Sequence, residues 1–303
     1  MIEVHSILKG SSAEITLTET TPCCGDGCCA ENEADAAQDT ELDAAAIKAV
    51  VREKYAEAAR TPDAGCCGDG CCGDDLTMID DEYEGIAGYV ADADLGLGCG
   101  LPTEHAGIRA GDTVLDLGSG AGIDAFIART LVGAEGRVLG VDMTPEMIAR
   151  ARANAEKLGF ENVTFLQGEI EDLPLDAAVV DVVVSNCVLN LVPDKHRAFS
   201  EMHRVLRPGG RFCISDIVVR GDIPASLRRS ASLYVGCVAG ALEEAEYLAL
   251  LEAAGFNEVT VVKEKPVQVP DEILQSLLTP EEHRTLLEKG TTLVSITVTG
   301  MKG

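Results

Sequence analysis

The stretch Val114-Leu115-Asp116-Leu117-Gly118-Ser119-Gly120-Ala121-Gly122 decides the fold of this chain. It joins an apolar, strand-like run directly to a glycine-rich turn, after which helical sequence follows. Glycines are needed in such a turn because a ligand approaches the backbone there and a side chain would block it. A dinucleotide-binding loop would have its third glycine at position 123, which is occupied by Ile123. The loop therefore predicts a different ligand, and Asp116, with no diphosphate beside it, can face a cation.

Strand-like and helical segments alternate from residue 79 onward, as expected for βαβ units that build a parallel sheet. The expected strands cover residues 113–117, 137–141, 163–166, 179–184 and 211–215, and the clearest helices cover 145–158 and 196–206. Arg207-Pro208-Gly209-Gly210 is expected to end the second of these helices. A final pair of strands, over 258–262 and 293–298, is expected to extend one edge of the sheet. The pattern predicts a doubly wound, Rossmann-like α/β domain.

Cysteines are concentrated before residue 76, where two copies of one cassette occur. The copies are Cys23-Cys24-Gly25-Asp26-Gly27-Cys28-Cys29 and Cys66-Cys67-Gly68-Asp69-Gly70-Cys71-Cys72. An acidic linker over residues 31–43 and an amphipathic helix over 42–59 separate them. We therefore expect two domains, a cysteine-rich N-terminal segment over 1–75 and an α/β domain over 76–303.

The chain is strongly acidic, with 24 Lys and Arg residues against 51 Asp and Glu residues and a formal net charge of −27. Such a charge repels phosphate backbones and anionic lipids, so no nucleic acid or membrane partner is expected. It is also consistent with a high-salt cytosol, because the Debye length falls to roughly 3 Å at molar salt. No export signal opens the sequence, and no apolar stretch reaches the length of a membrane span. We expect a cytoplasmic monomer whose cysteines stay reduced and serve metal binding or redox chemistry.

Acidic residues follow three successive expected strands. Asp116 ends the first, Asp142 closes the second at about the ribose-binding spacing, and Glu169 follows the third, where it could accept from an adenine amine. Because the carboxyl ends of parallel strands share one edge, these acids define one pocket. This set resembles the class I methyltransferase superfamily, whose members bind S-adenosylmethionine at that edge. The resemblance implies that the methionine portion is lined by Gly118, Gly120 and Gly122.

Three cysteines outside the cassettes are placed to reach this pocket. Cys187 follows the fourth expected strand, while Cys99 and Cys237 lie in glycine-containing segments before the first strand and after the fifth. Three soft thiolates without histidine suit a thiophilic trivalent centre better than magnesium or calcium, and zinc usually takes a fourth ligand. Trivalent arsenic takes three sulfurs and keeps a lone pair that can attack a methyl group, so no general base is required. Cys213, inside the fifth strand, is expected only to pack in the core.

The chain resembles the arsenite methyltransferases from about residue 51 to its end. The shared motifs are, in order, Gly98-Cys99-Gly100-Leu101-Pro102, Asp116-Leu117-Gly118-Ser119-Gly120, Val141-Asp142-Met143-Thr144, Ser185-Asn186-Cys187-Val188, and Cys237 with Gly240-Ala241-Leu242. The resemblance implies that arsenic is bound by Cys99, Cys187 and Cys237. It also implies that an upstream pair, best matched by Cys66 and Cys67, assists the redox cycle through a disulfide. The neighbouring Cys71-Cys72 could substitute for that pair.

The sequence thus predicts an enzyme that transfers methyl groups from S-adenosylmethionine to arsenite, free or as a thiol conjugate. A thioredoxin- or glutathione-type thiol is the expected reducing co-substrate. The expected cofactor-binding residues are Asp116, Gly118, Ser119, Gly120, Gly122, Asp142, Met143, Thr144, Glu169 and Asn186. Two alternatives remain open. One is a methyltransferase for a small organic acceptor, which needs no cysteine triad, and the other is a thiol-rich metalloid-binding protein without turnover.

Overall fold

The computed structural model describes residues 44–60, 83–228, 237–238, 240–269 and 271–303. These residues belong to one compact unit, Glu41–Gly303. Both cysteine cassettes, including Cys66 and Cys67, lie outside the described residues, as does the acidic linker. The roles predicted for them, and the predicted domain boundary after residue 75, therefore stay predictions.

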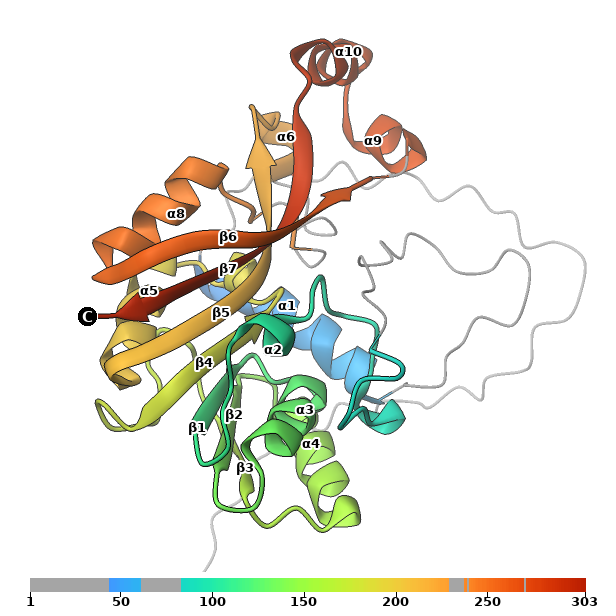
Figure 1. Cartoon of the computed structure of the whole chain (residues 1–303). Helices are drawn as coiled ribbons and strands as arrows, with labels where there is room; N and C mark the ends of the chain where they lie inside the picture. Colours follow the sequence, from blue (N-terminus) through green and yellow to red (C-terminus); the bar gives the residue numbers. More distant parts are fainter. Residues whose placement is uncertain (1–43, 61–82, 229–236, 239, 270) are drawn as a thin grey trace, which may run out of the picture. The chain divides into compact units, whose positions relative to one another are not determined.

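Seven strands form one sheet in the order β3-β2-β1-β4-β5-β7-β6 (Figure 1). Their bounds are β1 Thr113–Leu117, β2 Arg137–Asp142, β3 Val163–Gln167, β4 Val180–Asn186, β5 Leu206–Arg220, β6 Phe256–Val267 and β7 Thr292–Lys302. The strands β1 to β5 are parallel, whereas β7 runs antiparallel between β5 and β6. The doubly wound sheet predicted from the sequence is confirmed, and the last two strands extend one edge as expected.

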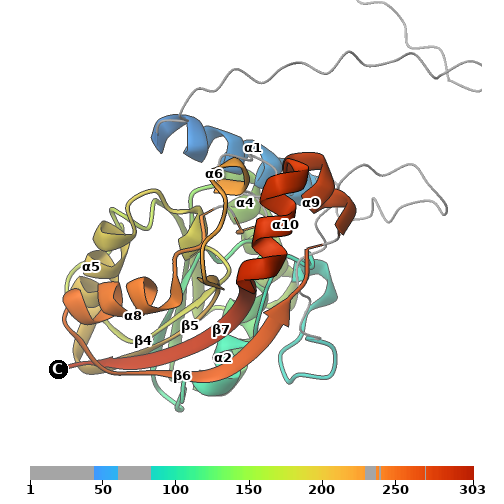
Figure 2. The ribbon, with the colours of Figure 1, turned by 90° about the horizontal axis from the view of Figure 1, so that it is seen from above.

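Helices cover both faces of the sheet. They are α1 Ala44–Arg60, α2 Pro102–His105, α3 Ile123–Val132, α4 Pro145–Leu158, α5 Lys195–Val205, α6 Ala225–Arg228, α8 Glu244–Ala253, α9 Asp271–Leu277 and α10 Pro280–Lys289, with short 3-10 turns η1 Ala91–Ala93 and η2 Leu189–Leu191. The helices α2, α3 and α4 pack on one face, and α5 and α8 lie together on the other (Figure 2). Val114 of β1 packs toward the first group, and Leu115 and Leu117 toward the second. Burial on both faces explains why β1 is an almost continuous apolar run.

The fifth strand is longer than the sequence indicated. The structure extends it from Leu206 to Arg220, because its second half pairs with β7 as far as Arg220. Arg207-Pro208-Gly209-Gly210 does end α5, but it then forms an irregular start of β5, where the pairing with β4 shifts register. Gly209 has a φ of 74° there, which glycine adopts without strain.

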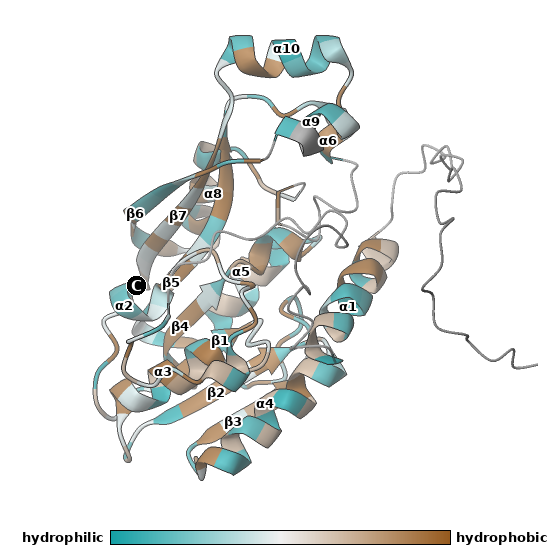
Figure 3. Cartoon of the chain, turned by 90° about the vertical axis from the view of Figure 1, so that its right-hand side faces the viewer, coloured by the Kyte–Doolittle hydropathy of each residue, from teal (hydrophilic) through white to brown (hydrophobic). Residues whose placement is uncertain are grey.

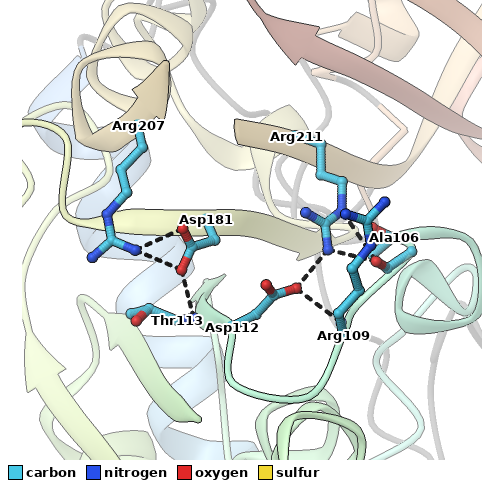
Figure 4. Close-up of polar contacts among 8 residues, drawn as sticks. Ala106, Arg109, Asp112, Thr113, Asp181, Arg207 and Arg211 are labelled. Carbon is cyan, nitrogen blue, oxygen red and sulfur yellow. Dashed lines mark hydrogen bonds and ion pairs between the residues drawn. The ribbon is translucent and has the colours of Figure 1, made fainter. Parts of the chain in front are cut away.

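Ion pairs fix the amino edge of the sheet (Figure 4). Arg207 of β5 places one guanidinium nitrogen 2.6 and 2.7 Å from the two carboxylate oxygens of Asp181, which also accepts from the Thr113 amide at 2.9 Å. Arg211 binds Asp112 at 2.5 Å. These contacts join the starts of β1, β4 and β5.

The helix α1, which the sequence predicted over residues 42–59 of the N-terminal segment, packs on the α/β domain and lies alongside α4 (Figure 3). Its buried residues are Val51 and Ala56. Its end is held by Arg60, which binds Glu146 at 2.5 Å, and by Arg150, which donates to the Ala59 carbonyl at 3.2 Å. The helix therefore closes part of the carboxyl edge of the sheet.

A cap of short helices lies beyond the carboxyl end of β5 (Figure 1). Leu227 of α6, Leu274 of α9 and Leu286 of α10 join an apolar cluster that also contains Val51 of α1. The same cluster contains the buried side chains Cys99, Cys187 and Cys237. In the described part of the chain, no helix combines the length and the apolar character needed to cross a bilayer.

Candidate active site

A cavity opens at the carboxyl edge of the sheet, with an empty volume of about 1020 Å³ that includes its open mouth. Its walls come from α1, from the loop before α2, and from the ends of β1, β2, β3 and β4. The cavity is lined by Asp116, Gly118, Ser119, Gly120, Asp142, Met143, Thr144, Glu169 and Asn186, all predicted from the sequence as cofactor-binding residues.

The glycine loop after β1 approaches the cavity with two residues of positive φ. Gly118 has a φ of 68° and Gly120 one of 49°. A Cβ atom at Gly118 would lie 2.4 Å from a methyl carbon of Val188, so only glycine fits between the two chain segments. The Gly118 amide donates to the Val141 carbonyl at 2.8 Å, which ties the loop to the end of β2.

Gly122 directly precedes α3 and has a φ of 102°. A Cβ atom there would lie 2.9 Å from ring carbons of both Phe126 and Phe165. Glycine at this position therefore permits close packing of α3 against the sheet. The predicted place of Gly122 at the methionine portion of a ligand stays a prediction.

The carboxylate of Asp142 is oriented by two backbone amides. It accepts from Gly120 at 3.0 Å and from Thr144 at 2.8 Å. Burial raises the pKa of Asp142, while these hydrogen bonds lower it in part. Because both amides hold the carboxylate from the protein side, the group faces the cavity in a fixed orientation suited to accepting from a ligand hydroxyl.

Three buried polar atoms at the cavity have no hydrogen-bond partner among the described residues. They are Asp116 Oδ2, Ser119 Oγ and Asp124 Oδ1. Burial raises the pKa of Asp116 well above its ordinary value and that of Asp124 to about 6, and the charge of Asp124 raises the pKa of Asp116 further. Adjacent buried carboxylates without a cation are costly, because each destabilises the ionised form of the other. The site therefore fits a cationic ligand, as the ammonium and sulfonium groups of S-adenosylmethionine would supply.

At its outer end the cavity is closed by α1. Lys48 places its ammonium 2.7 Å from Glu169 and 3.0 Å from Glu171. Burial lowers the pKa of Lys48, but the hydrogen bonds to these two glutamates outweigh it and the pKa is raised. Glu169 is thus held by Lys48, and its predicted contact with an adenine amine stays a prediction.

The structure brings the three predicted cysteines into one buried cluster. Cys187 directly follows β4 and lines the cavity, Cys99 lies in the loop before α2, and Cys237 lies between α6 and α8. Their exposed fractions are 2%, 1% and 0%. The Cys237 thiol donates to the Cys187 carbonyl at 2.7 Å, and the Cys99 thiol to the Ser215 carbonyl at 3.5 Å. Three distant chain segments therefore meet beside the cofactor cavity.

In this conformation the thiols of Cys237 and Cys99 donate to backbone carbonyl groups. Burial raises the pKa of Cys99, and both burial and the neighbouring thiols raise that of Cys187 well above its ordinary value. Within the described residues, no three His, Cys, Asp or Glu side chains are arranged as a ready metal site. Cys187 and Cys237 have positive φ values of 56° and 60°, which are uncommon for residues with a Cβ. Binding of a trivalent ion here requires the thiols to turn from the carbonyls and lose their protons.

The remaining cysteine of the domain behaves as predicted. Cys213 lies in β5 with no exposed surface and packs in the core between the sheet, α3 and α4, apart from the other three thiols. Burial raises the pKa of its thiol. Its role is packing.

Three residues at the site were not predicted from the sequence. Asp124 stands in the first turn of α3, where a carboxylate complements the helix dipole, and this position was a usable signal. Tyr83 donates to Asp124 at 2.9 Å from a segment with no sequence pattern. Tyr55 of α1 lines the cavity. Burial raises the pKa of its phenol well above the ordinary value, as do the charges of the groups around it, namely Cys237, Cys187, Asp142 and Cys99.

A sheet of this order with one antiparallel strand, together with a glycine loop and acidic residues at its carboxyl edge, defines the class I fold of S-adenosylmethionine-dependent methyltransferases. Residues 108–255 match the family model described as a methyltransferase domain. An arsenic(III) S-adenosylmethionine methyltransferase from Chlamydomonas reinhardtii has a similar structure, with 40% identity and a TM-score of 0.57 over 67% of this chain and 66% of that one.

The sequence relatives share one substrate within this class of methyltransferases. The arsenite methyltransferase of Halobacterium salinarum is 51% identical over 176 residues, which are 58% of this chain and 45% of that protein. The arsenite methyltransferase of Homo sapiens is 37% identical over 192 residues, or 60% of this chain and 50% of that protein. Over the matched residues the chain is similar to arsenite methyltransferases. It spans about half the length of the relatives that it matches.

Proposed function

We propose that this protein methylates trivalent arsenic, with S-adenosylmethionine as methyl donor and arsenite as substrate. One observation carries the proposal: Cys187 lines the cavity that fits the donor, and Cys99 and Cys237 lie in the same buried cluster as Cys187. A methyltransferase for an organic acceptor has no need of three thiols in that position. The names of the relatives support the same substrate.

The thiols hold the substrate. Each S–As bond forms as a thiol gives up its proton and an oxygen ligand of the arsenite leaves as water, so loading consumes no net proton. Cys187 lies next to the cavity, so arsenic bound to it faces the methyl donor. Three sulfur ligands leave the arsenic lone pair as the nucleophile, and the described residues that line the cavity include no histidine to serve as a base.

The residues around the cavity bind and align the donor. S-adenosylmethionine, when bound, supplies a methyl group on a sulfonium that a lone pair can displace. Asp142 is oriented to accept from ribose hydroxyls, and Asp116 and Asp124 neutralise positive charge. The side chains of Cys99, Cys187 and Cys237 are almost fully buried. Tyr55 of α1 and the apolar cluster formed with α6, α9 and α10 therefore keep water from the three thiols. Rate enhancement then comes from alignment of lone pair and methyl group.

Methylation leaves the arsenic formally oxidised by two electrons, so a dithiol must reduce it while forming a disulfide. We assign this step to Cys66 and Cys67, which lie outside the described residues. A thioredoxin- or glutathione-type thiol would then reduce the disulfide. A reducing cytoplasm suits this chemistry, and we propose that the enzyme acts there as a monomer.

Mass spectrometry of the products from arsenite, S-adenosylmethionine and a thiol tests the proposal. The intact protein should form methylarsenicals, and Cys187→Ser and Cys237→Ser should abolish them. Cys213→Ser is the matched control, since it removes an equally buried thiol outside the cluster. Cys23→Ser and Cys24→Ser should change little.

The same assay separates the alternatives. A panel of quinones and other organic acceptors is offered in parallel with arsenite. Methylation of an organic acceptor that survives Cys187→Ser would contradict the proposal in favour of an organic substrate. Tight arsenite binding without consumption of S-adenosylmethionine would identify a metalloid-binding protein instead.

A further inference from the structure

The side chain of Asn186 fixes the peptide groups around Cys99. Asn186 is the last residue of β4 and lines the cofactor cavity. Its amide oxygen accepts from the Cys99 backbone amide at 3.0 Å, and its amide nitrogen donates to the Gly100 carbonyl at 2.7 Å. One side chain therefore holds the backbone on both sides of the Cys99 side chain.

The same amide group contacts a buried pair of residues toward the cavity. The Asn186 amide nitrogen lies 2.5 Å from the Tyr83 hydroxyl and 3.2 Å from Asp124 Oδ2. The Tyr83 hydroxyl in turn donates to the same Asp124 oxygen at 2.9 Å. Tyr83 and Asp124 are only 3% and 4% exposed. The other Asp124 oxygen has no partner among the described residues, so the network ends at the cavity.

The segment Gly98-Cys99-Gly100 has little room to move away from this network. A Cβ atom at Gly98 would lie 2.9 Å from the Asn186 amide nitrogen, and one at Gly100 would lie 2.5 Å from the Ser215 hydroxyl. The Ser295 hydroxyl donates to the Cys99 carbonyl at 2.6 Å. The backbone of Cys99 is therefore fixed from both sides, with Asn186 on the side of the cavity.

We propose that Asn186 is the positioning residue that presents Cys99 as the third sulfur ligand, and that Tyr83 and Asp124 couple this placement to occupation of the donor cavity. The inference rests on the proposed function, because it takes Cys99 to be an arsenic ligand. A cationic donor beside Asp124 keeps that carboxylate ionised and strengthens the hydrogen bonds that it accepts from Tyr83 and Asn186. The amide is then held in the orientation that offers its oxygen to Cys99.

Such coupling is reciprocal. If the donor raises the affinity for arsenite, arsenite raises the affinity for the donor by the same factor. Couplings between sites are typically about 5–150-fold, so a change of about tenfold in either affinity is expected. The enzyme would then favour the complex that holds both substrates over either binary complex.

The test counts sulfur ligands by arsenic K-edge X-ray absorption and measures arsenite affinity by calorimetry, with and without S-adenosylhomocysteine. The full-length chain is used with its eight cassette cysteines replaced by serine, so that only the cluster near the cavity binds arsenic. We expect three As–S contacts in this protein and two in Asn186→Ala, as in Cys99→Ser. The effect of S-adenosylhomocysteine on arsenite affinity should be lost in Asn186→Ala.

Tyr83→Phe separates positioning from coupling. It keeps the bonds from Asn186 to Cys99 and Gly100 and the direct 3.2 Å contact of Asn186 with Asp124, but removes the hydroxyl that bridges these two residues. Three As–S contacts should remain, while the effect of S-adenosylhomocysteine on arsenite affinity should be smaller than in the background protein. This pattern does not follow from a general loss of stability.

Asn162→Ala is the matched control. The Asn162 side chain is likewise held by hydrogen bonds, from Arg129 and to the carbonyls of Gly133 and Gly136, but it lies just before β3 at the amino edge. It should keep three As–S contacts and the full effect of S-adenosylhomocysteine. If Asn186→Ala keeps three As–S contacts and the full effect of S-adenosylhomocysteine on arsenite affinity, the inference is overturned, while the proposed function stands. Fewer than three contacts in the background protein would overturn the proposed function and the inference with it.

Discussion

Replacement of Gly118 by alanine should damage both the fold and the site. Gly118 has a φ of 68°, a conformation that costs a residue with a Cβ roughly 1–2 kcal/mol. The new methyl carbon would also lie 2.4 Å from one Val188 methyl and 2.7 Å from the Val188 Cβ. Overpacking of this kind costs roughly 1–3 kcal/mol. The free energy of unfolding should therefore fall by about 2–5 kcal/mol.

Thermal unfolding followed by far-ultraviolet circular dichroism measures this loss, which suits a chain without tryptophan. At roughly 2–4 °C per kcal/mol for a domain of this size, the midpoint should fall by roughly 4–20 °C. Val188 is adjacent to Cys187, so any shift of Val188 away from the new methyl group also displaces that thiol. Arsenite methylation should fall in parallel.

Gly159→Ala is the matched control, because Gly159 has a φ of 68° and a ψ of 31° but no atom within 4 Å of its added Cβ. It should lose only the conformational part, about 1–2 kcal/mol. Combining Gly118→Ala with Val188→Ala removes the shortest contact and should restore part of the loss. Equal destabilisation by Gly118→Ala and Gly159→Ala would refute the steric reasoning.

Three further predictions concern solution conditions. Burial raises the pKa of Asp124 to about 6. Affinity for S-adenosylmethionine should therefore fall as the pH decreases below 6, because the carboxylate gains a proton. Calorimetry should show a weaker pH dependence of this affinity for Asp124→Asn. Burial raises the pKa of Asp216 to about 7, so the folded protein binds a proton that the unfolded chain has released, and stability should fall as the pH rises from about 4 to 7. Denaturant titration of Asp216→Asn should remove much of that slope. The net charge of −27 predicts a midpoint that rises with KCl, and a flat dependence would contradict the high-salt interpretation.

The bounds of a helix or strand could be predicted where residues at its ends start or stop it. The bounds predicted for α4, residues 145–158, match the structure because Pro145 begins the helix and Gly159 ends it with a φ of 68°. The extent of β5 was not predictable in the same way. Its second half forms against β7, which lies far along the chain, and local residue preferences do not contain that pairing.

The same distinction between local and distant interactions applies to the residues of the candidate site. Asp116, Asp142 and the cysteines were predicted because each follows a recognisable strand or lies in a shared motif. The network of Asn186, Tyr83 and Asp124 joins residues far apart in the chain, and only the folded structure shows it. Aromatic packing also requires glycine at position 122, and a sequence pattern does not distinguish that cause from close approach of a ligand.

The three clustered thiols belong to the loop before α2, the end of β4 and the segment after α6, which are far apart in the chain. An ion bonded to all three would act as a removable cross-link between the nucleotide-binding half of the molecule and its cap. Loading of the substrate would then also protect the protein from heat and proteases, since a ligand that binds only the native state shifts the unfolding equilibrium. An arsenic-stressed cell would in this way lengthen the lifetime of the protein that it needs.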